Sequence, residues 1–189
     1  ARLISNNEDI NSLKNLKKEL IVDKKMIENE NILMSNKISK VELMGIYLRS
    51  GEFKNLFDLV GIVNQSDPKQ IYLEKAEKSY LQRYKENKDL KNLYSLLISQ
   101  ILQRKVIEAE KTIDLILKFD KNNGNAYLTK SIINIFLLDR KDSRSSIKLA
   151  KSYKISPESS EILKKVEGLT YILELKFRSR KARFVYEGA

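Results

Sequence analysis

Glycine and proline are scarce in this chain, and their scarcity limits the possible folds more than any other sequence feature. The 189 residues include only 6 Gly and 2 Pro, while Leu, Ile, Lys and Glu are plentiful. β-Hairpins and tight loops depend on Gly and Pro, whereas the plentiful residues suit helices. The sequence therefore predicts an all-α protein, and its 42% hydrophobic content is enough for the core of one sizeable domain.

Turn and capping residues recur along the chain and separate short helical segments. Gly51 suits a helix end in the left-handed conformation, and Pro157 after Ser156 suits the first position of a helix. Because the breaks are short, consecutive helices must run antiparallel. We expect helices at 38–50, 52–65, 69–86, 89–103, 106–120, 125–139, 142–155 and 158–178.

Residues 1–36 predict a separate amphipathic helix, roughly from Glu8 to Glu30, with lysines on its other face. This helix either docks on the rest of the domain or pairs with a partner helix. Docking is the favoured interpretation, because the apolar steps do not hold a sustained heptad. The apolar positions step by three and four residues: Ile10, Leu13, Leu16, Leu20 and Ile27.

An internal repeat with an offset of 34 residues links the middle of the chain to the segment that follows it. Leu93 falls on Tyr127, and Ile98 falls on Ile132. The break after Arg104 likewise falls on the break after Leu138. Self-similarity at this spacing is typical of stacked helix pairs.

The best single unit of this kind lies at residues 37–68. It resembles the tetratricopeptide repeat (TPR) family, which this unit matches at Leu43, Tyr47, Gly51, Phe53 and Pro68. The resemblance implies an antiparallel helix-pair array over residues 37–175, a TPR-like α-solenoid of about 8–9 helices. An irregular helical bundle is the alternative fold.

In tetratricopeptide arrays the first helix of each pair lines a concave groove, so the resemblance also implies a site. Such a groove would take an apolar peptide or helix from a partner protein. Helix 125–139 is apolar around most of its circumference, so the same residues could instead be core, enclosed by neighbours or by the chain's own terminal helix. The implied groove residues are Tyr94, Ile98, Ile101, Leu102, Leu128, Ile132, Ile135 and Phe136.

Catalytic chemistry finds little support in the sequence. The chain has no His and no Cys, so the commonest general base, metal ligands and nucleophile are missing. Acidic residues stand beside lysines, as Glu74 does beside Lys75, and no glycine-rich phosphate loop is present. We therefore expect a non-catalytic protein–protein interaction scaffold or adaptor with no cofactor and no metal.

A formal charge of +11 suggests a second function class, a basic protein that binds nucleic acid or an anionic membrane surface. This alternative would use lysine faces and a basic C-terminal tail, residues 176–189, in which aromatic residues alternate with cations. A solvated tail without such a function is the competing interpretation. The tail cations are Lys176, Arg178, Arg180, Lys181 and Arg183.

The cellular compartment stays open in the sequence. The chain starts at Ala1 with no signal-like apolar segment, which suggests that a targeting segment has been removed. No apolar run reaches the ~20 residues of a membrane span, so we expect a soluble protein. The sequence fixes neither the partner's identity nor the oligomeric state.

Overall fold

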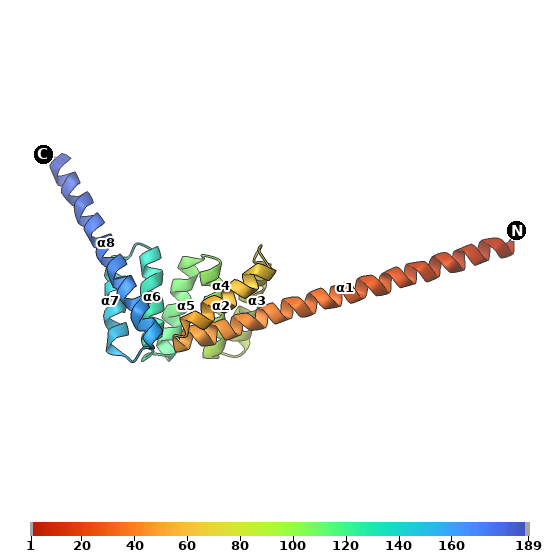
Figure 1. Cartoon of the computed structure of the whole chain (residues 1–189), viewed down its shortest axis with the longest axis horizontal. Coiled ribbons are helices and arrows are strands. Elements are labelled where there is room, and N and C mark those ends of the chain that lie inside the picture. Colours follow the sequence, from red (N-terminus) through yellow and green to blue (C-terminus); the bar gives the residue numbers. More distant parts are fainter. Residues whose placement is uncertain (1, 188–189) are drawn as a thin grey trace. The chain divides into compact units, whose positions relative to one another are not determined.

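The computed structural model describes the backbone of residues 2–187 and the side chains of residues 10–180. Within that range the chain forms eight helices and no strand, as the sequence predicted (Figure 1). The helices are α1 (Arg2–Ser50), α2 (Phe53–Ser66), α3 (Ile71–Glu86), α4 (Leu90–Leu102), α5 (Val106–Phe119), α6 (Gly124–Phe136), α7 (Arg140–Ser152) and α8 (Pro157–Glu187).

The chain divides into two compact units, residues 1–37 and residues 38–189. The sequence suggested a helix ending near Glu30 and a new one starting at residue 38, and this was wrong, because α1 is continuous. The reason is local: no Gly or Pro stands between Glu30 and Lys40, and the Asn and Ser residues there each weaken a helix by only a fraction of a kcal/mol.

Helices α3 to α7 form a stack in which each helix packs on the next one in sequence (Figure 1). Helix α8 packs on both α6 and α7. The starts of α4 and α6, Leu90 and Gly124, are 34 residues apart, and so are the starts of α5 and α7, Val106 and Arg140. The predicted 34-residue spacing of helix pairs is therefore present in the structure.

Three junctions in the stack contain a residue with left-handed backbone conformation. Gln70, Arg104 and Leu138 have φ of 55°, 61° and 58°, and they too are 34 residues apart. Each lies just ahead of α3, α5 or α7, so α3 has the phase of the second helix of a pair. The sequence did not assign this phase, because none of the three residues is the glycine that usually marks a left-handed turn.

The two helix boundaries predicted with a specific mechanism are confirmed. Gly51 has φ of +74°, and a Cβ there would collide with the Ser156, Ser159 and Asn125 side chains. Helix α8 begins at Pro157, and the Ser159 amide donates to Ser156 Oγ over 3.0 Å. Gly51 therefore both ends α1 and makes room for the start of α8.

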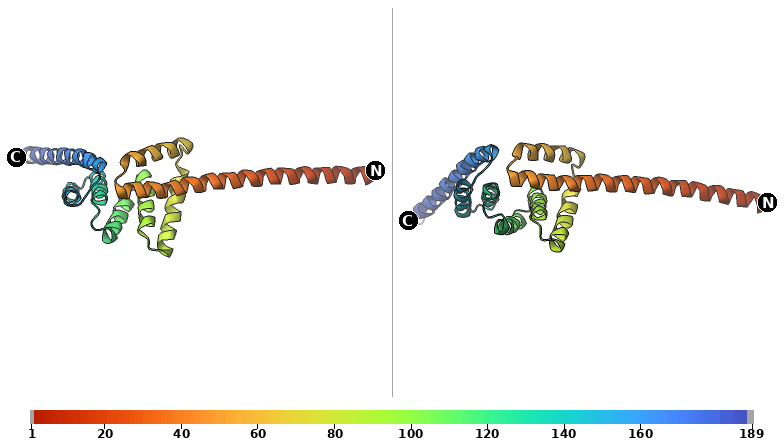
Figure 2. Two further views of the ribbon diagram at one scale, coloured as in Figure 1. Left: turned by 60° about the horizontal axis from the view of Figure 1, so that its bottom comes forward. Right: turned by 90° about the horizontal axis from the view of Figure 1, so that it is seen from below.

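The C-terminal part of α1, residues 38–50, lies between α2 and the helix stack (Figure 2). Tyr80 Oη of α3 donates to the carbonyl oxygen of Ile38 over 3.1 Å. A Cβ added to Gly45 would come within 3.1 Å of the Tyr94 and Ser95 backbone, so α1 and α4 approach closely there. With α3, α5 and α1 around it, α4 is buried continuously over residues 93–100.

Small polar side chains fill the contact between α6, α7 and α8. Ser143 Oγ is 2.9 Å from Thr170 Oγ1, and Ser146 Oγ donates to Asn134 Oδ1 over 3.1 Å. These residues are all at most 5% exposed. Small residues allow close helix approach but bury little apolar surface, so this end of the stack is held largely by hydrogen bonds.

The last helix is longer than the sequence suggested. We expected it to end near residue 178 and a frayed tail to follow, but α8 continues to Glu187. Arg, Lys and Ala predominate in this stretch and are good helix formers, and no proline follows Pro157. A high charge density alone did not end the helix.

Candidate partner-binding surfaces

The groove implied by the family resemblance is not a continuous exposed surface. Tyr94, Ile98 and Leu128 are at most 2% exposed, so they belong to the core and cannot contact a partner in this structure. Ile101, Leu102, Ile132 and Ile135 are half-buried, and Phe136 is 72% exposed.

The environment of Tyr94 explains why this part of the expected groove is closed. The Arg49 guanidinium of α1 lies 5.8 Å from the centre of the Tyr94 ring, and Tyr94 Oη donates to Asp120 Oδ2 over 2.7 Å. Burial, and then the bond to the Asp120 carboxylate, raise the pKa of Tyr94 well above its ordinary value. The chain's own residues 38–50 thus cover this end of α4.

A polar cleft of about 480 Å³ opens beside this contact. Its one carboxylate, Asp120, is already paired with Arg49 Nε at 3.2 Å and accepts from Asn123 Nδ2 at 2.9 Å. Asn123 Nδ2 also reaches the carbonyl oxygen of Arg49. These bonds join α1 to the turn before α6, so the group acts as a structural junction. The cleft is lined by Ile46, Arg49, Ser50, Asp120, Asn122, Asn123 and Lys154.

A row of cations follows one side of α7 at spacings of three and four residues: Arg140, Arg144, Lys148 and Lys151. Sequence reasoning missed this row, although its helical spacing was visible. Arg144 pairs with Glu174 and Lys151 pairs with Glu167, both from α8, across a cleft of about 320 Å³. Half of the row is therefore neutralised within the chain.

The basic residues expected in the tail lie on the end of α8. Lys176, Arg178 and Arg180 are exposed, whereas Lys181 and Arg183 lie outside the range whose side chains are described. Phe177 contributes one contact to the stack, because the Arg140 guanidinium lies 3.7 Å from its ring centre.

The most apolar exposed surface of the chain lies on residues 10–33 of α1. Ten large apolar side chains there are each between 46% and 65% exposed. The sequence identified five of them, but assumed that the rest of the domain would cover them. The ten are Ile10, Leu13, Leu16, Leu20, Ile21, Val22, Met26, Ile27, Ile32 and Leu33.

Two further searches concern the described residues only. Among them no three acidic side chains gather closely enough to hold a metal ion. None of the helices, over its described part, is both long and apolar enough to cross a bilayer.

The fold and its exposed surfaces define the chain as an all-helical array with a long N-terminal helix. Protein-family models, curated proteins and solved structures gave no significant match to it.

Proposed function

We propose that this chain is a non-catalytic protein–protein interaction module whose partner binds to residues 10–34 of α1. The observation that carries the proposal is the set of ten exposed apolar side chains on this one helix. Contiguous exposed apolar surface of this kind marks interaction sites in water-facing proteins. A single helix in water also gains little stability from its own hydrogen bonds, so a covering partner would stabilise it.

The stack of helices is compatible with this function. Its 34-residue repeat supports the resemblance to tetratricopeptide arrays, which act by binding other proteins. The proposed contact surface differs from the one that the resemblance implied, because Tyr94, Ile98 and Leu128 are buried. Apolar residues of the N-terminal helix take the place of the groove.

Binding of nucleic acid or an anionic membrane surface is a weaker candidate. It would use the row of cations on α7 and the basic end of α8, but Arg144 and Lys151 already pair with glutamates. Pairing reduces the positive potential available to phosphates. The apolar surface of α1 has no comparable internal partner among the described side chains.

Capture from an extract of the native cell tests the proposal. The tagged full chain should recover a partner, and the double variant Leu20→Glu/Ile27→Glu should lose it, because two charges then replace apolar contacts. The matched control is Asn15→Glu/Asn29→Glu, which adds the same charge on the polar side of the helix. Capture that the first variant leaves intact, or that both variants lose equally, would contradict the proposal. Thermal melts of all three chains confirm that residues 38–189 remain folded.

A further inference from the structure

A line of apolar residues in the N-terminal unit repeats every seven positions: Leu13, Leu20, Ile27 and Met34. The first three are 65%, 61% and 57% exposed. Residues seven apart stay on one side of a helix when two helices wrap around each other with a left-handed twist. The line therefore has the geometry of one core position in a helix pair.

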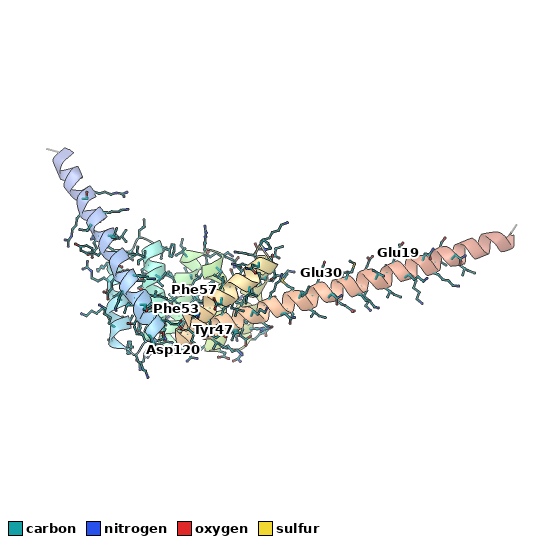
Figure 3. The ribbon with its side chains drawn as sticks, viewed as in Figure 1. Glu19, Glu30, Tyr47, Phe53, Phe57 and Asp120 are labelled. Carbon is teal, nitrogen blue, oxygen red and sulfur yellow. The ribbon has the colours of Figure 1, made fainter. Side chains whose placement is uncertain are left out.

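Opposite charges lie on the two flanks of this line. Glu19, Asp23 and Glu30 follow one flank, and Figure 3 shows Glu19 and Glu30 on the same side of α1, three turns apart. Lysines follow the other flank, where Glu28 is the one acidic exception. These lysines are Lys14, Lys17 and Lys24.

The separation of charge restricts which helix can cover the apolar line. When two copies of one helix lie parallel about a two-fold axis, the acidic flank of each faces the basic flank of the other. When they lie antiparallel, acidic faces acidic and basic faces basic, which is repulsive. In the parallel arrangement Glu19 stands opposite Lys24 of the second copy, five residues further along, as paired flanking positions do in parallel coiled coils.

We propose that the partner of residues 10–34 is a second copy of this chain, bound in parallel and in register. This inference rests on the function proposed above and names the occupant of the same surface. Asp23 and Glu30 lie close to the apolar line, and Asp23 is next to the position that Lys24 of the second copy occupies. The acidic residues near the centre weaken the pair and select the parallel orientation.

Single cysteines test orientation and register directly, because the native chain has no Cys. In the full chain, Leu13→Cys, Leu20→Cys and Ile27→Cys should each give a disulfide-linked dimer under dissolved oxygen with a copper catalyst. Two thiols lose two protons and two electrons to oxygen, and the bond forms only if the Cα atoms come within about 7 Å. An antiparallel pair can place at most one of the three positions opposite itself.

Val22→Cys is the matched control, since it is exposed on the opposite side of the same helix. Crosslinking at the three line positions should be at least about tenfold faster than at Val22→Cys, given the steep distance requirement of the disulfide. Light scattering of the wild type should give twice the 22.0 kDa of one chain.

A charge exchange gives a second measurement that does not depend on oxidation. Glu19→Lys alone, or Lys24→Glu alone, should weaken the dimer by about threefold to tenfold, because each creates two like-charge contacts. The double variant Glu19→Lys/Lys24→Glu restores opposite charges and should return to near the wild-type dissociation constant.

The outcomes separate this inference from the proposed function. A chain that stays monomeric, or that crosslinks no faster at Leu20→Cys than at Val22→Cys, overturns self-association. If Leu20→Glu/Ile27→Glu nevertheless abolishes capture of another protein, the interaction function stands with a different partner. If self-association is correct, the tagged chain recovers its own untagged copy, and the double glutamate variant does not.

Discussion

At the scale of single residues, burial separates two positions that the sequence treats alike. Ile98 and Phe136 both belong to first helices of the 34-residue pairs, yet Ile98 is 2% exposed and Phe136 is 72% exposed. Ile98 lies in the stretch of α4 that its neighbours surround, whereas Phe136 is the last residue of α6. The position along the helix, rather than the residue type, decides which of them is core.

Charge substitution at these two positions should have opposite results. Phe136→Glu should change the free energy of unfolding by no more than about 0.5 kcal/mol, because the new charge stays in water. Ile98→Glu buries an unpaired charge, which should cost several kcal/mol out of the ~5 to 15 available to a domain. Thermal melts of both variants beside wild type measure the difference. A large loss of stability in Phe136→Glu would show that Phe136 belongs to the core.

At the scale of elements, α8 changes character along its length. Its buried residues, Ser159, Leu163, Val166 and Thr170, recur at three- and four-residue steps and face α6 and α7. From Leu175 to Arg180 every residue is exposed. The helix continues past its packed part because its residues are good helix formers, and the Arg140–Phe177 contact is the one printed tie of this end to the stack.

Truncation should therefore be tolerated at one point of α8 and not at another. A chain ending at Leu175 loses the Arg140–Phe177 contact, worth about 0.5–1 kcal/mol at an exposed site, and should keep a cooperative melt. A chain ending at Glu167 also loses Thr170 and leaves the buried Ser143 hydroxyl without this partner, so its midpoint should fall further. Loss of the cooperative melt in the longer truncation would make the basic end structural.

At the scale of the whole molecule, three buried tyrosines connect the helices of the larger unit. Tyr72 Oη donates to Asn64 Oδ1, Tyr80 Oη reaches the α1 backbone, and Tyr94 Oη donates to Asp120 Oδ2. Burial, and then the nearby Asp67 carboxylate, raise the pKa of Tyr72 to about 12. Burial is also the main cause that raises the pKa values of Tyr80 and Tyr94.

These shifts predict a loss of stability at alkaline pH. The folded state holds the phenol protons more tightly than the unfolded state, where the pKa of tyrosine is near 10.0. The tyrosine contribution is therefore fully present below pH 10 and is lost above it, by up to about 1.4 kcal/mol per pH unit for each tyrosine. Urea unfolding followed by circular dichroism from pH 8 to 11 measures the slope. Tyr94→Phe should be less stable at pH 8 and should show a shallower alkaline slope; an unchanged slope would contradict the assignment.

The sequence by itself determined the helical class, the short breaks and the 34-residue spacing. These properties follow from local chemistry: scarce Gly and Pro, apolar periodicity, and capping residues such as Gly51 and Ser156. The continuity of α1 was also local information, but we overestimated the helix-breaking effect of exposed Asn and Ser residues.

Only the tertiary structure decided which apolar residues are covered. A helical pattern states which side chains share a face, but not whether a segment 50 residues away lies on that face. Residues 38–50 of α1 lie on α4 because Gly45 allows the two backbones to approach, and so Tyr94 and Ile98 became core instead of groove. Leu20 and Ile27 have the same kind of sequence pattern, but no element of the chain covers them, because long-range packing is a property of the whole fold.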